Sequence, residues 1–145
     1  MPRYYDEVEL GDDLPPVDRV ATDQAVQDFC TMWDDPRIGR LTGRFTDNEA
    51  AKAEGLPGAI VPGAMSMGYL AQFLSQWADG GSLKKLDVVF RQLVLHERPL
   101  RLVGVVTDKN QVGDENQVEC DVYLESADGE RLVSGKGTVV LPGRE

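Results

Sequence analysis

The order of apolar and polar residues predicts three helices in the first half of the chain. Thr22 is a suitable N-cap for the first helix. The apolar residues that follow recur at the i, i+3, i+4, i+7 spacing of one buried helical face: Val26, Phe29, Cys30 and Trp33. The run Asp34-Asp35-Pro36 is expected to end this helix, because proline disfavours a helical conformation in the residue before it.

Two further helices are expected after an irregular loop from Arg37 to Arg44. Thr46 opens the sequence T-D-N-E, a capping box with Glu49 three residues later, and Gly55 is placed to stop the helix. The next helix is expected from Gly63 to about Ala78. This last helix is apolar on nearly every side, so protein is expected to surround it.

The second half of the chain alternates between apolar and polar residues, which is the pattern of half-buried strands. The alternating apolar sets are Leu86, Val88 and Phe90; Leu100, Leu102, Gly104 and Val106; and Val118, Cys120, Val122 and Leu124. Asp128-Gly129 is a hairpin signal before a last strand from Arg131 to Val140, whereas Gly11 to Asp18 is expected to be a loose Asp/Pro-rich passage. We therefore predict an α+β fold with a curved antiparallel sheet wrapped around the third helix, in one domain over residues 1–145.

Composition limits the possible functions. The sequence has 25 acidic and 15 basic residues and a net charge of −10, which opposes binding to nucleic acid. Cys30 and Cys120 form no CxxC pair and His96 is the only histidine, so neither a disulfide framework nor a metal site is expected and both thiols are expected to be buried and reduced. No cofactor is expected. A signal-peptide pattern and an apolar run long enough for a bilayer are both missing, which predicts a soluble cytoplasmic protein without membrane contact.

The stretch from Thr46 to Gly63 resembles the core motif of a known family. Asp47, Ala51, Gly55-Leu56, Ile60-Val61 and Gly63 stand in register with the motif of the MaoC-type (R)-specific enoyl-CoA hydratases and dehydratases. The opening YYDEVELGDDLP is also similar to the usual first strand of that family, so the resemblance covers almost the whole chain. It implies the hotdog fold and an acyl-thioester substrate.

The catalytic part of the motif departs from the family. The resemblance places the catalytic histidine of the family on Phe45, which cannot donate or accept a proton. It places the catalytic aspartate on Asp35, ten positions before Phe45 where the motif has a separation of about five. An insertion within Arg37 to Arg44 would explain the difference and leaves the register of that loop open.

Hydration of a trans-2-enoyl thioester needs a base for the water, an acid for the alpha carbon and a donor for the thioester oxygen. In the family an Asp/His pair serves the first two needs and a backbone N–H at the start of the buried helix serves the third. Gly63 matches that backbone position, where a free amide and the helix dipole coincide. The resemblance implies substrate contacts at Phe45, Pro62, Gly63, Ala64 and Met65, with Asp35 as the candidate catalytic residue.

Each of these residues also has a structural interpretation. Asp35 could be a loop acid that ends a helix, Phe45 could serve packing, and Gly63 after Pro62 could be a turn glycine. His96 is expected to be a surface loop histidine. The long side chains of the third helix are expected in the core: Met65, Met67, Tyr69, Phe73 and Trp77.

The arginines of the loop leave another choice open. Arg37, Arg40 and Arg44 could contact coenzyme A phosphates, since an acidic protein that binds a polyanion needs a local cationic patch. They could equally be solvated.

The resemblance also implies a dimer, because pairing two hotdog sheets removes an exposed sheet edge and the family builds its acyl site at that boundary. The first hypothesis is a non-catalytic acyl-binding subunit that pairs with a catalytic MaoC-like partner and binds an acyl-CoA or acyl-carrier thioester. A second is a self-sufficient homodimeric hydratase or a hotdog thioesterase that uses Asp35 or Asp47. A third is a protein that binds a lipid-like ligand without chemistry.

Overall fold

The computed structural model describes residues 1–32 and 42–144. Its five strands form one antiparallel sheet in the order β1-β3-β4-β5-β2, which confirms the predicted α+β class. In chain order the elements are the 3-10 helix η1 (Tyr5–Glu7), β1 (Asp13–Val20), α1 (Asp23–Met32), the 3-10 helix η2 (Gly43–Phe45), α2 (Asn48–Ala53), α3 (Gly63–Trp77), β2 (Ser82–Phe90), β3 (Pro99–Val112), β4 (Glu115–Ser126) and β5 (Arg131–Leu141).

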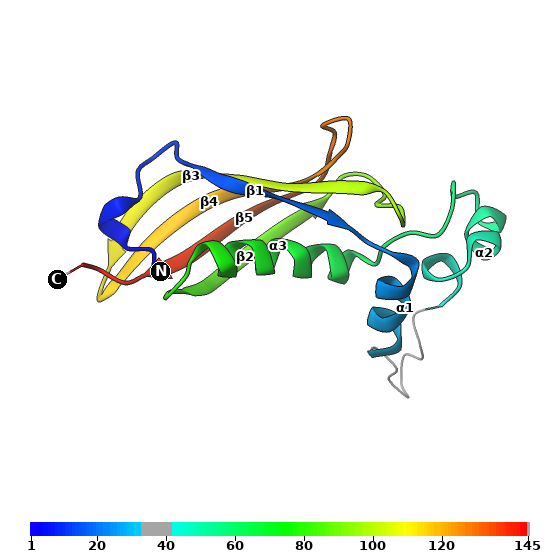
Figure 1. Ribbon diagram of the computed structural model, residues 1–145, viewed down its shortest axis with the longest axis horizontal. Helices are drawn as coiled ribbons and strands as arrows, with labels where there is room; N and C mark the ends of the chain where they lie inside the picture. Colours follow the sequence, from blue (N-terminus) through cyan, green and yellow to red (C-terminus); the bar gives the residue numbers. More distant parts are fainter. Residues whose placement is uncertain (33–41, 145) are drawn as a thin grey trace.

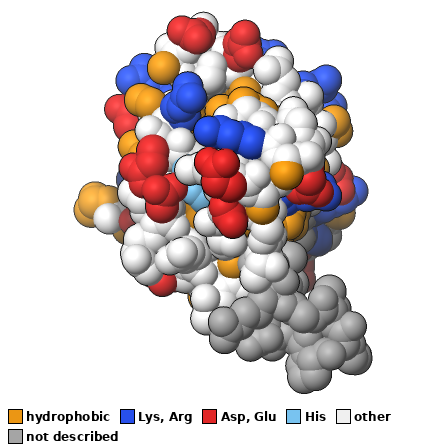
Figure 2. All heavy atoms as spheres, turned by 90° about the vertical axis from the view of Figure 1, so that its right-hand side faces the viewer, with side chains coloured by type: hydrophobic (Ala, Val, Ile, Leu, Met, Phe, Trp, Pro, Cys, Tyr) orange, Lys and Arg blue, Asp and Glu red, His pale blue; other side chains and the backbone are white. Residues whose placement is uncertain are grey.

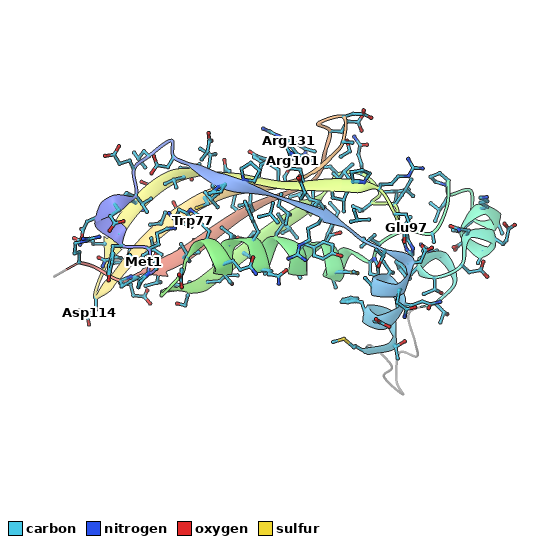
Figure 3. All side chains as sticks on the ribbon, viewed as in Figure 1. Met1, Trp77, Glu97, Arg101, Asp114 and Arg131 are labelled. Atoms are coloured by element: carbon cyan, nitrogen blue, oxygen red, sulfur yellow. The ribbon has the colours of Figure 1, made fainter. Side chains whose placement is uncertain are left out.

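The sheet curves over α3, as the apolar pattern predicts, and α1 and α2 lie beyond one end of the sheet (Figure 1). The side chain of Trp77, at the end of α3, is buried and points toward the sheet (Figure 3). Arg101 and Arg131 project from the opposite, outer face (Figure 3). Arg101 donates to the Asp18 carboxylate at 2.8 Å and holds the pKa of that carboxyl below its usual range.

The core lies between α3 and the inner face of the sheet. The apolar residues predicted for the inner face of β4 are all fully buried: Val118, Cys120, Val122 and Leu124. On β5, Gly137 lets the helix approach closely, because a Cβ at this position would overlap the side chain of Leu74. The missing side chain therefore sets the distance between α3 and the sheet.

The expectation that Met67 of α3 lies in the core is wrong. Met67 is 39% exposed, and it lies on an open side of the helix with Ala64, Gly68, Gln72 and Ser75. The sheet covers one side of the helix, and the other side carries small or polar residues with little apolar area to bury. Within the part of the chain that the structure describes, no element buries these residues.

The passage expected to be loose contains the first strand. β1 begins at Asp13 and pairs with β3, while the family-like opening before it forms η1 and a turn. The sequence pattern did not predict this strand because it contains Pro15 and Pro16, and proline is uncommon in strands. They are tolerated because β1 is an edge strand whose register shifts between Leu14 and Val17, so the missing N–H groups interrupt little of the ladder.

The helix ends follow their local signals with one exception. Thr22 caps α1 as predicted, since the Ala25 N–H donates to its Oγ1 at 3.0 Å. Gly55 ends α2 with a φ of +88°, which a residue with a side chain rarely adopts.

The N-cap of α2 is Asp47 and not Thr46. Asp47 Oδ1 accepts hydrogen bonds from the N–H groups of Glu49, at 2.9 Å, and Ala50. The η2 turn fixes the chain up to Thr46, whose N–H bonds to the Gly43 carbonyl, so the first free cap position is one residue later.

Both cysteines are free and buried, as predicted. Burial raises the pKa of the Cys30 thiol, and burial together with the neighbouring Asp121 carboxylate raises the pKa of Cys120 to about 12. In the described residues no helix has the length and hydropathy that crossing a membrane requires.

Candidate functional site

The N-terminus of α3 carries unpaired backbone amides. Its N-cap is Pro62, whose carbonyl accepts the N–H groups of Met65 and Ser66 at 3.0 and 3.2 Å. Among the described residues no group accepts a hydrogen bond from the N–H of Gly63 or Ala64. These two donors stand at the positive end of a helix dipole, where an oxygen with partial negative charge is favoured.

Main-chain hydrogen bonds fix the segment that leads into this helix. The Ile60 N–H donates to the carbonyl of Arg44 in η2 at 2.9 Å, and the Val61 N–H donates to the Val94 carbonyl at 2.7 Å. Ile60 also forms an isolated antiparallel bridge with Leu95. The loop between β2 and β3 and the turn η2 thus hold the approach to α3 from two sides.

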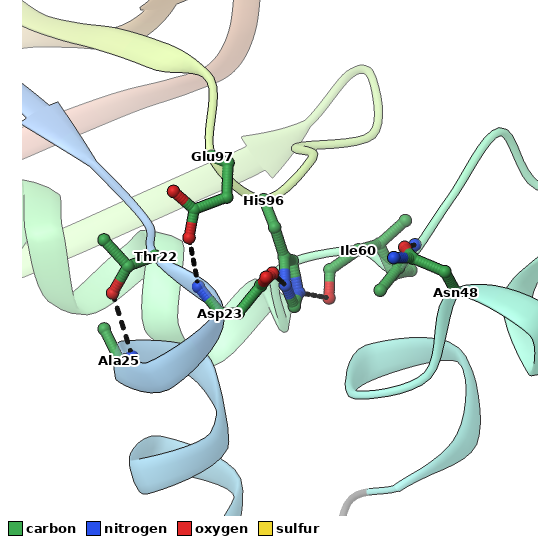
Figure 4. Close-up of polar contacts among 8 residues, drawn as sticks. Thr22, Asp23, Ala25, Asn48, Ile60, His96 and Glu97 are labelled. Atoms are coloured by element: carbon green, nitrogen blue, oxygen red, sulfur yellow. Dashed lines mark hydrogen bonds and ion pairs between the residues drawn. The ribbon is translucent and has the colours of Figure 1, made fainter.

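Side chains add two further contacts to the same segment. Asn48, the first residue of α2, accepts from the Ala59 N–H at 2.9 Å. His96 Nε2 lies 3.2 Å from the Ile60 carbonyl oxygen. Figure 4 shows Asn48 and His96 on either side of Ile60. The position of the Gly63 and Ala64 amides therefore depends on several elements that are distant in sequence.

The aromatic ring of Phe90 borders Gly63. A Cβ at position 63 would lie 2.9 Å from Cζ of that ring, so a larger residue would force the ring aside. Phe90 is 53% exposed, although the alternation along β2 places it on the inner face. Its ring and Gly63 form a partly open apolar edge at the start of α3.

The predicted substrate-binding residues fall in two connected places. Pro62, Gly63, Ala64 and Met65 are consecutive at the start of α3, where Pro62 and Met65 are buried and Ala64 is exposed. Phe45 ends η2 and packs, partly buried, against the hydrophobic core. The hydrogen bond between Ile60 and the residue before Phe45 links the two places.

The predicted catalytic residue Asp35 lies outside the described residues, as do Arg37 and Arg40. Arg44 is described, and its guanidinium donates to Glu54 at 2.7 Å. The cation is therefore already paired with a carboxylate within this chain.

Asp47, the other acid considered for a thioesterase mechanism, also has a structural role. Its Oδ1 caps α2, so one of its carboxylate oxygens is held by backbone donors.

His96 does not fit the expectation of a surface histidine. It lies in the loop after β2 as expected, but its side chain is only 8% exposed, and Nδ1 lies 2.8 Å from Asp23 Oδ1. Asp23 and His96 are 73 positions apart, so no local pattern in the sequence indicated this pair.

One face of α3 also meets the edge strand β1. The Arg19 guanidinium lies over the Tyr69 ring, 5.3 Å from its centroid, and donates to Gln72. Burial raises the pKa of the Tyr69 phenol, and the charge of Arg19 opposes this shift only in part. The phenol therefore stays protonated at neutral pH.

The end of the molecule formed by α1, α2 and the adjoining loops mixes acidic, basic and apolar side chains (Figure 2). Among the described residues, no group of three or more His, Cys, Asp or Glu side chains is placed to hold a metal ion.

A comparison with protein-family models matches residues 45–127 to the MaoC-like domain. The match covers more than half of the chain and includes α2, α3 and β2 to β4. The chain belongs to the family of MaoC-like domains. A comparison with curated proteins finds no match.

Solved structures with the same architecture include two R-hydratases. The R-hydratase PhaJ1 from Pseudomonas aeruginosa superposes with a TM-score of 0.83 at 17% identity, over 97% of this chain and 86% of that chain. The (R)-hydratase from A. caviae involved in PHA biosynthesis has a TM-score of 0.79 at 18% identity, over 93% of this chain and 98% of that one.

A third similar structure is a complex. A chain of the ChsH1-ChsH2 complex from Mycobacterium tuberculosis has a TM-score of 0.75 at 16% identity, and the match covers 92% of this chain and 98% of that chain. At these identities the structural similarity establishes the hotdog fold for this MaoC-like chain, and its chemistry has to be argued from its own residues.

Proposed function

We propose that this MaoC-like chain is the acyl-thioester-binding, non-catalytic half of a heteromeric enoyl-thioester hydratase. The free amides of Gly63 and Ala64 carry the proposal, together with Phe45 at the position that the family resemblance assigns to the catalytic histidine. The amides supply the group that binds an oxygen. The phenylalanine cannot supply a proton or take one up.

The free amides suit a thioester carbonyl. When a nucleophile adds to an enoyl thioester, negative charge grows on the carbonyl oxygen, and backbone donors in fixed positions stabilise it without reorganisation. The segment before α3 is held by Arg44, Asn48 and Val94, so the donors of Gly63 and Ala64 are fixed before a ligand arrives. The side chains of Pro62, Ala64 and Met65 carry no titratable group, so none of them can transfer a proton to or from a bound thioester.

Hydration also needs proton transfer, which the proposal assigns to a partner chain. Addition of water requires a base and an acid near the double bond, and the general acid–base step contributes about 10² to 10⁴ in rate. A chain with phenylalanine at the histidine position lacks half of this pair. The ChsH1-ChsH2 complex among the similar structures supports an assembly of two different chains.

The unpaired edge of the sheet is the proposed contact with that partner. Among the described residues, β2 is an outer strand that pairs only with β5. Its Val89 and Phe90 are 56% and 53% exposed. Edge strands with exposed apolar residues tend to pair with another chain, and pairing along β2 would bring the partner to Phe90 and the start of α3.

The remaining parts of the proposal follow from the family and from composition. We propose a single hotdog domain over residues 1–145, a cytoplasmic location, and a substrate held as a thioester of coenzyme A or of an acyl-carrier protein. No cofactor is required, since hydration is an acid–base reaction.

The test is hydration of a trans-2-enoyl-CoA by the purified chain, followed by loss of the ultraviolet absorbance of the conjugated thioester. We expect no turnover from the chain alone. We expect turnover when a co-encoded MaoC-like chain with an intact Asp/His motif is added.

The Asp35→Ala variant is the control for an altered catalytic site. Turnover by the chain alone that this substitution abolishes would contradict the non-catalytic role and indicate a self-sufficient hydratase. Release of free coenzyme A without hydration would indicate a thioesterase instead.

A further inference from the structure

Ser66 of α3 is a polar residue in the hydrophobic interior. It is 1% exposed, and it shares a face of the helix with Leu70 and Trp77, about one and three turns further along. The side chain of Trp77 shows the direction of this face, because it points toward the sheet (Figure 3). The Ser66 side chain therefore lies between α3 and the inner face of the sheet.

The hydroxyl group of Ser66 has no hydrogen-bond partner among the described residues. In the same part of the chain Arg19 Nε is also buried without a partner, but the Arg19 guanidinium donates to Gln72 through another nitrogen. The Ser66 side chain has no second polar atom, and burying a hydroxyl without a partner destabilises the fold. A group of this kind needs an explanation other than stability, and contact with a ligand is one.

Ser66 lies next to the amides at the start of α3. Residues three positions apart are neighbours on a helix, and a helical side chain leans toward the N-terminus over the preceding turn. The Ser66 hydroxyl is therefore directed toward Gly63 and Ala64, whose N–H groups have no acceptor among the described residues. One hydroxyl and two amides thus form a single polar site.

The ring of Phe90 covers this site on the side of the sheet. A Cβ at position 63 would lie 2.9 Å from Cζ of the ring, so the ring packs over the first turn of α3, on the face that includes Ser66. Phe90 is 53% exposed, so its ring can rotate toward solvent without a change in the core. Rotation of this one side chain gives a ligand access to the inner side of Gly63.

The order of the three groups sets the orientation of a bound acyl thioester. Exposure falls from Ala64 at the surface through the partly buried Gly63 to Ser66. Coenzyme A is large and charged and stays in solvent, so the acyl chain is the part that passes inward. With the thioester oxygen on the amides, the atoms of the acyl chain nearest to Ser66 are C2 and C3.

We propose that Ser66 binds an oxygen atom at C3 of the acyl group, so that this chain prefers 3-hydroxyacyl thioesters to saturated ones. A hydroxyl both donates and accepts a hydrogen bond, which makes it complementary to another hydroxyl. Hydration of an enoyl thioester places its new hydroxyl at C3. This inference rests on the proposed acyl-binding function and specifies the form of the acyl group that is bound.

The test compares hexanoyl-CoA, which has no oxygen at C3, with each enantiomer of 3-hydroxyhexanoyl-CoA by calorimetric titration. For the natural chain we expect one enantiomer to bind about fivefold more tightly than hexanoyl-CoA, the effect of one hydrogen bond between neutral groups. In Ser66→Ala this preference should disappear, while hexanoyl-CoA should bind at least as tightly as before.

Ser75→Ala is the matched control, because Ser75 lies on the exposed side of the same helix. It should keep the preference of the natural chain. Equal affinities of the natural chain for all three thioesters would overturn the inference and leave the proposed function intact. An unchanged preference in Ser66→Ala would also overturn it and assign the hydroxyl to a buried water only. No binding of any of the three would overturn the proposed function and the inference together.

Unfolding in urea gives a readout that a purely structural role of Ser66 would not produce. Because a buried hydroxyl without a protein partner destabilises the fold, Ser66→Ala should raise the denaturation midpoint at least as much as Ser75→Ala, in which alanine only improves helix propensity. A midpoint for Ser66→Ala below that of Ser75→Ala would show that the hydroxyl is bonded within the protein and would overturn the inference.

Discussion

Gly63 combines a free backbone amide with the absence of a side chain. Its amide is free for a ligand, and its missing side chain leaves room for the Phe90 ring. The sequence and the family resemblance predicted the free amide. The space for the Phe90 ring depends on a contact between the start of α3 and the end of β2, which no local pattern reveals.

The substitution Gly63→Ala tests both the binding role of the amide and the packing of Phe90 against this position. The new methyl group would lie 2.9 Å from Cζ of Phe90, but the ring is at the surface and can turn aside. We expect the free energy of unfolding to change by less than about 1 kcal/mol. We expect hexanoyl-CoA to bind severalfold more weakly, because the methyl and the displaced ring crowd the amides.

Chemical denaturation and calorimetric titration measure the two effects. The double variant Gly63→Ala with Phe90→Leu should regain part of the affinity. Unchanged binding in Gly63→Ala would show that no ligand approaches the amide at position 63.

Single residues also mark the limit of what the sequence could predict. Thr22, Gly55 and the two cysteines behave as predicted because their roles follow from neighbouring residues or from composition. His96 does not, because its partner Asp23 is brought to it by the packing of α1 against the loop before β3.

At the scale of elements, the order of apolar and polar residues correctly predicted most helices and strands. The continuous apolar stretch predicted α3, alternation predicted β2, β3 and β4, and the hairpin signal Asp128-Gly129 predicted β5. β1 was missed because an edge strand tolerates prolines that would disrupt a central strand. The predicted N-cap of α2 was one residue too early because Thr46 is held by the η2 turn, and Asp47 is the first residue free to cap the helix.

The close packing of α3 on β5 gives a prediction at this scale. Gly137→Ala would place a methyl group against the fully buried Leu74 side chain, which cannot turn toward solvent. We expect a loss of about 1 to 3 kcal/mol in the free energy of unfolding.

Gly68→Ala is the matched control on the exposed side of the same helix, where no atom lies within 4 Å of the added Cβ. It should stabilise the chain by about 0.5 to 1 kcal/mol, because alanine restricts the unfolded chain and favours the helix. Urea denaturation compares the two variants. Equal effects would mean that α3 does not sit as close to β5 as described.

At the scale of the whole molecule, the open edge of β2 and the exposed side of α3 are the surfaces available to the proposed partner chain. The sequence predicted a dimer only through the family resemblance. The structure adds where the open edge lies and which side of α3 is uncovered in the described part of the chain.

A pair of valines tests the edge. Val89 on β2 and Val112 at the end of β3 are 56% and 53% exposed, so lysine is equally accessible to water at either position. Val89→Lys should weaken self-association or partner binding severalfold, because the charge enters the proposed contact, while Val112→Lys should leave it unchanged. Sedimentation velocity over a range of concentrations measures the shift, and equal behaviour of the two variants would place the contact elsewhere.

The most direct test of acyl binding without catalysis is equilibrium dialysis of the purified chain against a trans-2-enoyl-CoA, with the enoyl and 3-hydroxyacyl thioesters quantified on both sides of the membrane. We expect enoyl-CoA to accumulate on the protein side and no 3-hydroxyacyl-CoA to form. Formation of 3-hydroxyacyl-CoA by the chain alone would contradict the non-catalytic role, and equal enoyl-CoA on both sides would contradict acyl binding.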